Sequence, residues 1–471
     1  MRRSPAFKMF VLTLAVLLGA VVVGGLGRGA EPAAGDAFDG GGRVVVRDAS
    51  LVLTMDPKLG TGPLGQLADA DVLLDGTRIK AVGKDLDAGG AKVVDGRGKI
   101  VLPGFVDTHN HLWQSLIRGC AADDNVDGWL GRCVLPLYGA PVTGQDAYAG
   151  ARLSTVDLVG TGVTTVTDWS HAFNTGFADG NLRALADSKM RFVFSYGASA
   201  DPAVQEAVRT AKKQFIDPNP LANLEIGSHP SSGNFTNLDA SEKLSRELGV
   251  PLNVHLLESK NDAATGQMDA LRKADALQPG LVANHVVHPT DAELDELAAH
   301  DVRVAHNPLS NMRLASGVAP VPDMLKRHIK VGLGLDGGTN DTSDMYNVMR
   351  AAVGLQRAKY VDPAAQPTVT EVLRMATLGG AEVLGLDREI GSLTPGKKAD
   401  LQIVDPQQIN FAPKVDWLNQ LVFNTQPSNV QWVFVDGRAL KRDGRVLGVD
   451  TAQVIRDAQA AADHLKQLLP E

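Results

Sequence analysis

Two patterns of apolar and polar residues alternate along the chain, and they predict two kinds of architecture. At both ends, short apolar runs are separated by tight polar turns. Asp-Gly between apolar runs is typical of a β-hairpin. Such pairs occur at Asp75-Gly76, Asp95-Gly96 and Asp436-Gly437. We therefore predict one small, sandwich-like β domain that is assembled from both chain ends, residues 43–103 and 386–450.

Between these ends, apolar strand candidates alternate with amphipathic stretches such as 239–248 and 291–299. Eight strand candidates end near His109, Asp168, Gly197, His229, His255, His285, His306 and Asp336. Eight strands that alternate with helices indicate an α/β protein with a (β/α)8 barrel, which we place at residues 104–385. The active site of this fold lies at the carboxyl ends of the strands, so the His and Asp residues there are candidates. Residues 451–471 are predicted to form a C-terminal helix.

Residues 1–30 have the pattern of a targeting segment. Arg2 and Arg3 precede an uncharged, mostly apolar run at 9–27. A basic start before an apolar core is typical of an export signal, and the run is also near the length of a membrane span. We predict a signal peptide, with an uncleaved N-terminal anchor as the alternative. In both cases the folded part is expected to be exported, periplasmic or extracellular. The Gly- and Ala-rich residues 31–42 are predicted to be a linker.

Composition restricts the class of partner more than it restricts the fold. The chain has 471 residues, of which 44% are hydrophobic and 21% charged, as in an ordinary globular protein. Its formal net charge is −8, and the sequence has no basic stripe. This argues against a nucleic-acid partner. Contact with a membrane is expected only if the N-terminal segment stays attached.

Cys120 and Cys133 are the two cysteines of the chain, and no Cys-x-x-Cys pair occurs. A thiolate zinc site is therefore excluded. In an oxidising compartment the two could form a disulfide that staples the loop after the first barrel strand. Two unpaired, partly buried thiols are the alternative. Any metal site must consequently depend on His and carboxylate residues.

The first barrel strand runs directly into His109-Asn110-His111. Residues two apart on a strand share a face, so both imidazoles point to one place, where they suit a zinc- or iron-type ion. His255 ends a later strand, and Asp336 follows the last strand. Because a barrel closes on itself, Asp336 lies beside the first strand. The sequence therefore predicts one catalytic ion with three imidazoles, one carboxylate and a position open for water.

Three side chains are candidates for moving protons beside this ion. Water on such an ion becomes hydroxide near neutral pH. His285, at the sixth strand end, and the second oxygen of Asp336 are expected to hold that water and take its proton. Glu258 follows His255 by three residues and is expected to pass a proton to the leaving group. A solvated loop carboxylate is the alternative for Glu258.

A set of short motifs between residue 43 and about 440 is specific in combination. The motifs are 102–111 (LPGFVDTHNH), 116–119 (LIRG), 129–130 (WL), 162–165 (GVTT), 255–258 (HLLE), 306–308 (HNP), 317–322 (GVAPVP), 335–337 (LDG), 391–393 (GSL) and 395–401 (PGKKADL). Together they resemble the amidohydrolase superfamily, in its cytosine deaminase-like branch with S-adenosylhomocysteine deaminases, guanine deaminases and s-triazine hydrolases. The last motif resembles the return of that family's chain into its split β domain.

The resemblance implies a single ion, Zn with Fe as the alternative. It implies that His109, His111, His255 and Asp336 hold this ion, and that Glu258 and His285 serve proton transfer. Superfamily members with two ions usually bridge them with a carboxylated Lys or a Glu at the third or fourth strand end. Residues 194–197 and 226–229 place neither there, which favours one ion.

The resemblance also suggests substrate contacts. His229 matches a position that contacts substrate in many relatives. Trp129 matches an aromatic position in the loop over the pocket, with loop packing as the alternative, and Trp113 at the start of this loop is a third candidate. Residues 167–171 match no single activity, and 336–341 are only partly like a nucleoside deaminase. An export signal is unusual among the salvage deaminases of this branch.

The expected function is that of a metal-dependent aminohydrolase. Ion-bound hydroxide would attack the carbon that bears the amino group of an N-heterocycle, such as a nucleobase, nucleoside or triazine-like ring, and ammonia would leave. One alternative keeps the fold and ion but cleaves an amide, a cyclic amide or a halogenated ring. A non-catalytic, exported, metal-bound binding protein is the other, and the intact ligand set argues against it. The expected partner is a small-molecule substrate, and a homo-oligomer is left open because relatives are often oligomeric.

Overall fold

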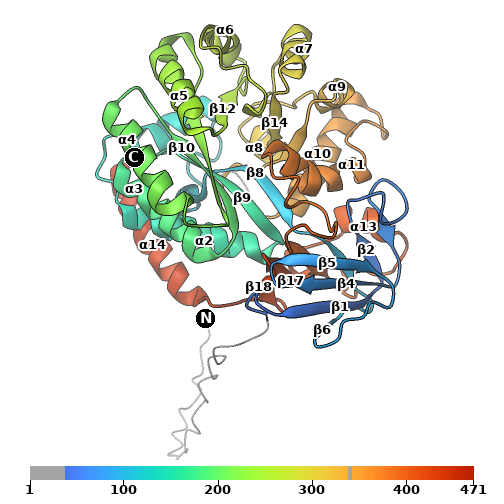
Figure 1. The fold of residues 1–471 in the computed structure, drawn as a ribbon. Coiled ribbons are helices and arrows are strands. Elements are labelled where there is room, and N and C mark those ends of the chain that lie inside the picture. The colour runs from blue at the N-terminus through green and yellow to red at the C-terminus, as the bar shows by residue number, and fades with distance from the viewer. Residues whose placement is uncertain (1–37, 338–341, 471) are drawn as a thin grey trace, which may run out of the picture. The chain divides into compact units, whose positions relative to one another are not determined.

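A parallel eight-stranded sheet lies at the centre of the chain, for which the computed structural model describes residues 38–337 and 342–470 (Figure 1). Its strands pair in chain order. They are β8 (Phe105–Asn110), β9 (Val163–Ser170), β10 (Arg191–Gly197), β11 (Ala222–Ser228), β12 (Leu252–Leu256), β13 (Val282–His285), β14 (Arg303–His306) and β15 (Val331–Leu333). After β15 the chain returns to the first strand, where the N–H of Asp336 donates to the carbonyl of His109 at 2.8 Å. The predicted (β/α)8 barrel is confirmed.

The barrel strands are buried along almost their whole length, which explains why they stand out as apolar runs. Each predicted strand end lies within three residues of the observed end. Helices separate the strands. They are α2 (Gly144–Gly160), α3 (Thr175–Ser188), α4 (Pro202–Ala211), α5 (Phe235–Leu248), α6 (Gln267–Lys273), α7 (Asp291–Ala299), α8 (Pro308–Arg313) and α9 (Val321–Lys326), followed after β15 by α10 (Met345–Tyr360), α11 (Val369–Arg374) and α12 (Gly380–Val383).

Two further sheets form a β domain from both chain ends, as predicted, and one of them combines strands from both ends. One has the order β5-β4-β1-β6 and the other β19-β18-β17-β16-β7-β2-β3. The strands of the first are β1 (Arg43–Ala49), β4 (Ala70–Asp75), β5 (Arg78–Gly83) and β6 (Lys92–Asp95). Those of the second are β2 (Leu51–Leu53), β3 (Gln66–Leu67), β7 (Ile100–Pro103), β16 (Leu401–Val404), β17 (Val430–Val435), β18 (Arg438–Arg442) and β19 (Arg445–Val446). One apolar core joins the sheets, with Val46 from one and Ile403 and Phe434 from the other.

One of the three predicted hairpins is wrong. Asp75-Gly76 joins the antiparallel pair β4 and β5, and Asp436-Gly437 joins β17 and β18. Asp95-Gly96 instead connects β6 to β7, which belong to different sheets. The reason is that β6 pairs in parallel with β1, so the turn after it must leave the sheet. A local Asp-Gly signal carries no information on such a long-range pairing.

The predicted signal peptide or anchor at 1–30 lies outside the described residues and stays a prediction, as does export. Of the predicted linker, the structure describes residues 38–42, which extend the β domain. Phe38 packs on Trp432 with ring centroids 5.2 Å apart, and the backbone of Asp39 forms an isolated antiparallel β-bridge with Arg438. Among the described residues, no helix is long and apolar enough to cross a membrane.

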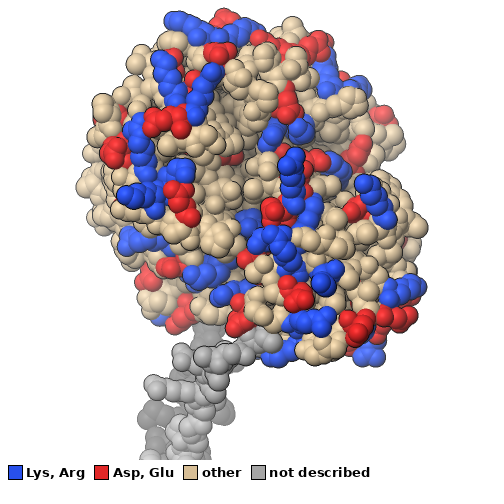
Figure 2. All heavy atoms as spheres, viewed as in Figure 1, with Lys and Arg blue, Asp and Glu red and all other residues tan. Residues whose placement is uncertain are grey.

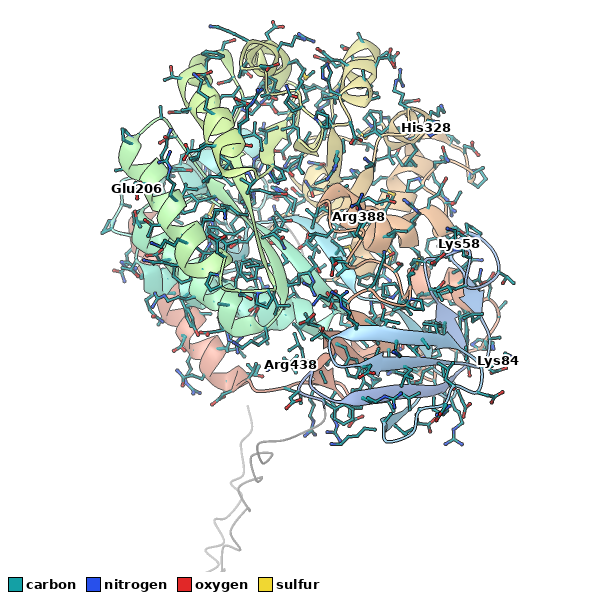
Figure 3. The ribbon with its side chains drawn as sticks, in the orientation of Figure 1. Lys58, Lys84, Glu206, His328, Arg388 and Arg438 are labelled. Carbon is teal, nitrogen blue, oxygen red and sulfur yellow. A yellow bond between two sulfur atoms is a disulfide. The ribbon has the colours of Figure 1, made fainter. Side chains whose placement is uncertain are left out.

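The outer surface carries charges of both signs. On the face in Figure 2, Lys and Arg side chains are interspersed with Asp and Glu. Figure 3 shows exposed side chains such as Lys58, Glu206 and His328 pointing away from the molecule. By contrast, His109, His285 and His306 at the barrel strand ends are buried.

The C-terminal helix and the loop after β8 share an apolar cluster. Helix α14 (Thr451–Leu468) packs on α2 and on the 3₁₀ helix η1 (Leu112–Ile117). Leu465 contributes to the same cluster as Trp113 and Trp129, the latter from the short helix α1 (Val126–Trp129). A disulfide joins Cys120 to Cys133 and closes the loop that contains α1. Helix α13 (Trp417–Phe423) lies in the connection between β16 and β17.

Candidate active site

The first barrel strand supplies two buried imidazoles. Nδ1 of His111 donates to the carbonyl of Trp169 at 2.6 Å, so its Nε2 is free to bind an ion. His109 is completely buried, and its Nδ1 has no hydrogen-bond partner among the residues that the structure describes. Buried polar nitrogens without partners are costly unless another group binds them. The end of this strand is therefore suited to bind a ligand such as a metal ion.

Four donor atoms converge at this point. Nε2 of His109 and Nε2 of His111 lie 3.2 and 3.4 Å from Oδ1 of Asp336. Nε2 of His255 lies 3.3 Å from Nε2 of His111. Two nitrogens bound tetrahedrally to one zinc ion are about 3.4 Å apart. His109, His111 and Asp336 thus form a group that could hold a divalent ion, and His255 approaches this group through His111.

The last strand brings Asp336 to the first strand at close range. A Cβ on Gly334 would lie 2.1 Å from Oδ1 of Asn307 and 3.0 Å from Cβ of His109, so this approach needs glycine. The hydroxyl of Ser310 donates to Oδ2 of Asp336, which leaves Oδ1 for the imidazoles. Burial opposes ionisation, but the surrounding imidazoles outweigh it and hold the pKa of Asp336 well below its usual range. The carboxylate is therefore ionised.

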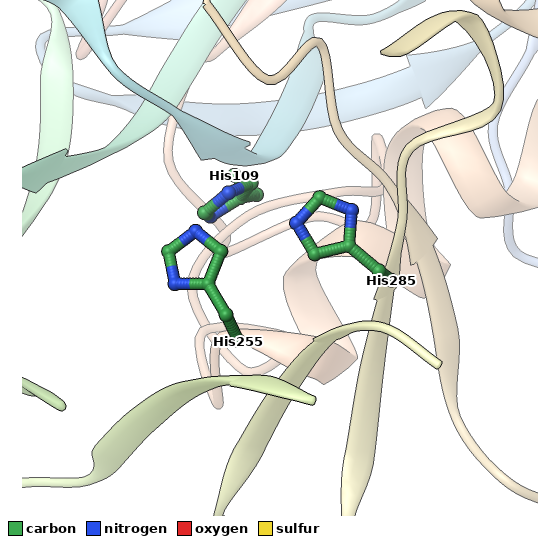
Figure 4. Close-up of side chains that lie close together, drawn as sticks. All are labelled: His109, His255 and His285. Atoms are coloured by element: carbon green, nitrogen blue, oxygen red, sulfur yellow. The ribbon is translucent and has the colours of Figure 1, made fainter. Parts of the chain in front are cut away.

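His285 lies between Asp336 and Glu258. Figure 4 shows its ring facing those of His109 and His255. The amides of Asn307 and Asn311 donate to its Nδ1 at 3.2 and 3.0 Å, so the ring proton is on Nε2. Burial lowers the pKa of His285 to about 3, which keeps the ring neutral. His285 is consequently a hydrogen-bond donor in this arrangement.

Glu258 is a buried carboxyl group that faces the cavity. Its Oε2 lies 3.5 Å from Nε2 of His285, and its Oε1 accepts from Ser316 and Asn311 at 3.3 and 3.4 Å. Burial, followed by the charge of Asp336, raises the pKa of Glu258 well above its usual value. This shift favours the protonated carboxyl group, the form in which Glu258 can act as an acid.

A cavity of about 410 Å³ opens above these groups. His229 and Trp129 line it, as do the ion-binding candidates His111, His255 and Asp336. This volume lies within the range of small-molecule sites. Trp113 lies behind the wall, completely buried, and its indole N–H donates to Nδ1 of His171 at 3.1 Å. Trp113 thus positions a lining residue, and a direct substrate contact by Trp113 stays a prediction.

Several site residues were not singled out from the sequence. His171 lines the cavity, and Ser310, Asn311 and Ser316 bind the acid-base groups from α8 and the turn after it. The available signal was position, because His171 follows the second strand and α8 opens directly after the HNP motif. Asp168 was a strand-end candidate, but its oxygens accept from the N–H of Leu112 and from Asn181, so it holds the loop after His111.

Barrel, convergent ligands and buried acid define the class of metal-dependent hydrolases, and sequence comparison gives the family. Residues 100–440 match the model of the amidohydrolase family. The chain belongs to this family, which confirms the resemblance seen in the motifs. It is similar to a 5′-deoxyadenosine deaminase of Methanobrevibacter smithii, with 31% identity over 90% of this chain and 98% of the relative.

Solved structures agree with this assignment. An adenosine deaminase from Xanthomonas campestris with bound zinc has a TM-score of 0.81 at 26% identity, and the match covers 90% of this chain and 98% of the other. A triazine hydrolase from Arthobacter aurescens has a TM-score of 0.81 at 25% identity, with 89% and 99% covered. The fold and family are therefore shared by proteins with different substrates.

The disulfide loop gives a first prediction for this site. The loop closed by Cys120 and Cys133 carries Trp129 and Asp127 into the cavity wall. Breaking the bond should loosen this wall, and we expect KM to rise about fivefold, or ~1 kcal/mol, with kcat nearly unchanged. The measurement is steady-state kinetics with and without a phosphine reductant, which, unlike a dithiol, does not compete for zinc.

The double variant Cys120→Ser/Cys133→Ser is the control. These are the two cysteines of the chain, so the variant should show the raised KM and no further response to reductant. An unchanged KM in both preparations would show that the apolar cluster alone holds the wall.

Proposed function

We propose that this protein is a metal-dependent aminohydrolase that releases ammonia from an amino-substituted N-heterocycle, with adenosine-type nucleosides as the first substrates to test. The observation that carries the proposal is the placement of Glu258 beside the candidate ligand set, where it accepts from Ser316 and Asn311 and lies 3.5 Å from His285. Attack on the carbon that bears the amino group is easier once the adjacent ring nitrogen gains a proton, so this reaction needs an acid at that position.

We infer one divalent ion at His109, His111, His255 and Asp336, and we propose zinc. Nε2 of His109 lies 3.2 Å from Oδ1 of Asp336, and the Nε2 atoms of His111 and His255 lie 3.3 Å apart, which supports the fit. Imidazole and carboxylate ligands also accept iron. The zinc in the related adenosine deaminase structure supports the choice. When bound, such an ion lowers the pKa of a water molecule and so supplies the nucleophile at neutral pH.

The side chains divide the proton transfers. Glu258 donates its proton to the ring nitrogen next to the carbon that bears the amino group. Asp336, ionised and fixed by Ser310, accepts a proton from the attacking water and returns it to the amino group, which leaves as ammonia. The remaining proton on the attacking oxygen returns to Glu258, so that water and the amino compound are consumed and the keto compound and ammonia are formed.

His285 has a narrower role in this proposal than the sequence suggested. Its Nδ1 accepts from two amide donors, so the proton of the neutral ring is on Nε2, which lies towards Glu258. We therefore propose that its Nε2–H donates a hydrogen bond to the attacking oxygen and orients it, while Asp336 takes the proton.

Removal of a halide from a ring is the second candidate, because a triazine hydrolase shares the fold at 25% identity. A 5′-deoxyadenosine deaminase is 31% identical over 90% of this chain, a higher identity than that of the triazine hydrolase, which favours deamination.

The experiment is a product screen of the zinc-loaded protein with amino- and chloro-substituted heterocycles, including 5′-deoxyadenosine. We expect ammonia release with kcat/KM of at least about 10⁴ M⁻¹s⁻¹ for one adenosine-type nucleoside. Chloride or carboxylate products without ammonia would replace deamination by one of the alternatives. The matched blank is the same protein after removal of the metal.

A further inference from the structure

The outer half of the cavity is apolar, in contrast to the polar inner half. The loop after β8 contributes Val126, Trp129, Leu130, Val134, Leu135 and Tyr138 to its wall. Leu314, at the end of α8, adds a further apolar side chain. Leu135 is 56% exposed and Tyr138 is 48% exposed. Large apolar side chains that stay exposed around a cavity indicate that it receives an apolar group.

The charged side chains of the outer half are both acidic. Asp127 lies on α1 and Asp262 begins the 3₁₀ helix η6 (Asp262–Thr265), and both residues line the cavity. The amide of Asn261 donates to Oδ2 of Asp127 at 2.9 Å, and the N–H of Ser259 donates to Oδ2 of Asp262 at 2.8 Å. Both carboxylates are therefore fixed in place rather than free to swing away from a ligand.

The wall contains no positive charge to balance them. Among the described residues, neither Lys nor Arg lines the cavity. Lys260 and Arg132 belong to the same two segments but are not part of the wall. Residues 338–341, which follow Asp336-Gly337, are Gly-Thr-Asn-Asp and add no cation.

The negative charges of Asp127 and Asp262 also act on Glu258, at the inner end of the cavity. Burial and the charge of Asp336 are the largest causes of the raised pKa of Glu258, and the charges of Asp262 and Asp127 add to them. A negative group on a substrate would experience the same field, with no cation in the wall to neutralise it.

We propose that this outer half makes the enzyme specific for amino-heterocycles whose substituent is uncharged and apolar, and that Asp127 and Asp262 exclude substituents that carry a phosphate or carboxylate group. The inference rests on the proposed function and names its substrate class. The apolar wall favours binding of an apolar substituent, and the two carboxylates repel an anionic one; specificity needs both effects.

The test compares ammonia release from 5′-deoxyadenosine, 5′-methylthioadenosine and adenosine 5′-monophosphate by the zinc-loaded protein. We expect kcat/KM for the monophosphate to be at least about 100-fold below that for either neutral nucleoside, because the phosphate group would lie beside two carboxylates with neither Lys nor Arg in the described wall. In the double variant Asp127→Asn/Asp262→Asn, the ratio of kcat/KM for 5′-deoxyadenosine to kcat/KM for the monophosphate should fall about tenfold. Asparagine keeps an oxygen that can accept each hydrogen bond but carries no charge.

The matched control is Asp123→Asn, which removes one charge from the same loop outside the cavity wall and should leave the ratio unchanged. Comparable turnover of the monophosphate and 5′-deoxyadenosine by the unaltered protein would overturn the inference while leaving deamination intact. An unchanged ratio in the double variant would overturn the role of the two carboxylates. Absence of ammonia from all three substrates would instead overturn the proposed function and the inference with it.

The apolar wall is tested separately with Leu135→Asn, a change at an exposed position that leaves the core untouched. We expect kcat/KM for 5′-methylthioadenosine to fall about fivefold while that for adenosine changes less than twofold, since the lost contact is with apolar surface. Equal losses for both substrates would contradict a contact between Leu135 and the substituent.

Discussion

Glu258→Gln should lower kcat for ammonia release by at least about 1000-fold while the bound metal stays at its normal level. Glutamine keeps the size of the side chain and can still accept from Ser316 and Asn311. It has no proton to give to the ring nitrogen. Because Glu258 lies 3.5 Å from His285 and outside the set of four ligands, the metal should remain. The measurement combines single-turnover kinetics with elemental analysis of the metal.

A matched control is available on the outer surface. Glu206→Gln makes the same chemical change on α4, where the side chain is exposed (Figure 3), and should leave kcat unchanged. Activity above about one tenth of the normal level in Glu258→Gln would remove the acid role from this residue, because general acid catalysis is worth far more than tenfold.

His255→Ala should remove both the bound metal and the activity. The change deletes one of three imidazole ligands and leaves His111 and Asp336 without the nitrogen that completes their set. We expect activity below about 0.1% of normal, because metal activation of water contributes several kcal/mol. Zinc should also no longer raise the melting temperature, since only binding to the folded protein stabilises it.

His300→Ala is the control for this prediction, because His300 is an exposed histidine at the end of α7. It should keep the metal content and the zinc-dependent rise in melting temperature. Full metal content in His255→Ala would show that another donor, such as His285, can occupy the fourth position.

The barrel and the ligand set could be predicted because both follow from regular features. Buried parallel strands are apolar along their length, so their ends are visible in the sequence, and a closed ring must bring Asp336 to His109. The Asp95-Gly96 turn shows the limit: its local pattern is that of a hairpin, but the pairing of β6 with β1 depends on residues 48 positions away.

The residues that tune the site were harder to predict. Asn311 and Ser316 act through hydrogen bonds from a short helix and the turn after it, where polar residues have no periodic signal. The side-chain direction of Trp113 depends on the 3₁₀ helix that carries it, and this direction turns it towards His171 rather than the cavity. The pairing of Cys120 with Cys133 likewise required coordinates, because spacing alone allowed two free thiols.

The central claim is that one divalent ion at the barrel mouth enables this chain to release ammonia from an adenosine-type nucleoside. The most direct test is to titrate the metal-free protein with zinc and follow ammonia release from 5′-deoxyadenosine. We expect activity to rise in proportion to added zinc and to reach a plateau at about one ion per chain. Activity that is equal with and without metal, or a plateau only at about two ions per chain, would contradict it.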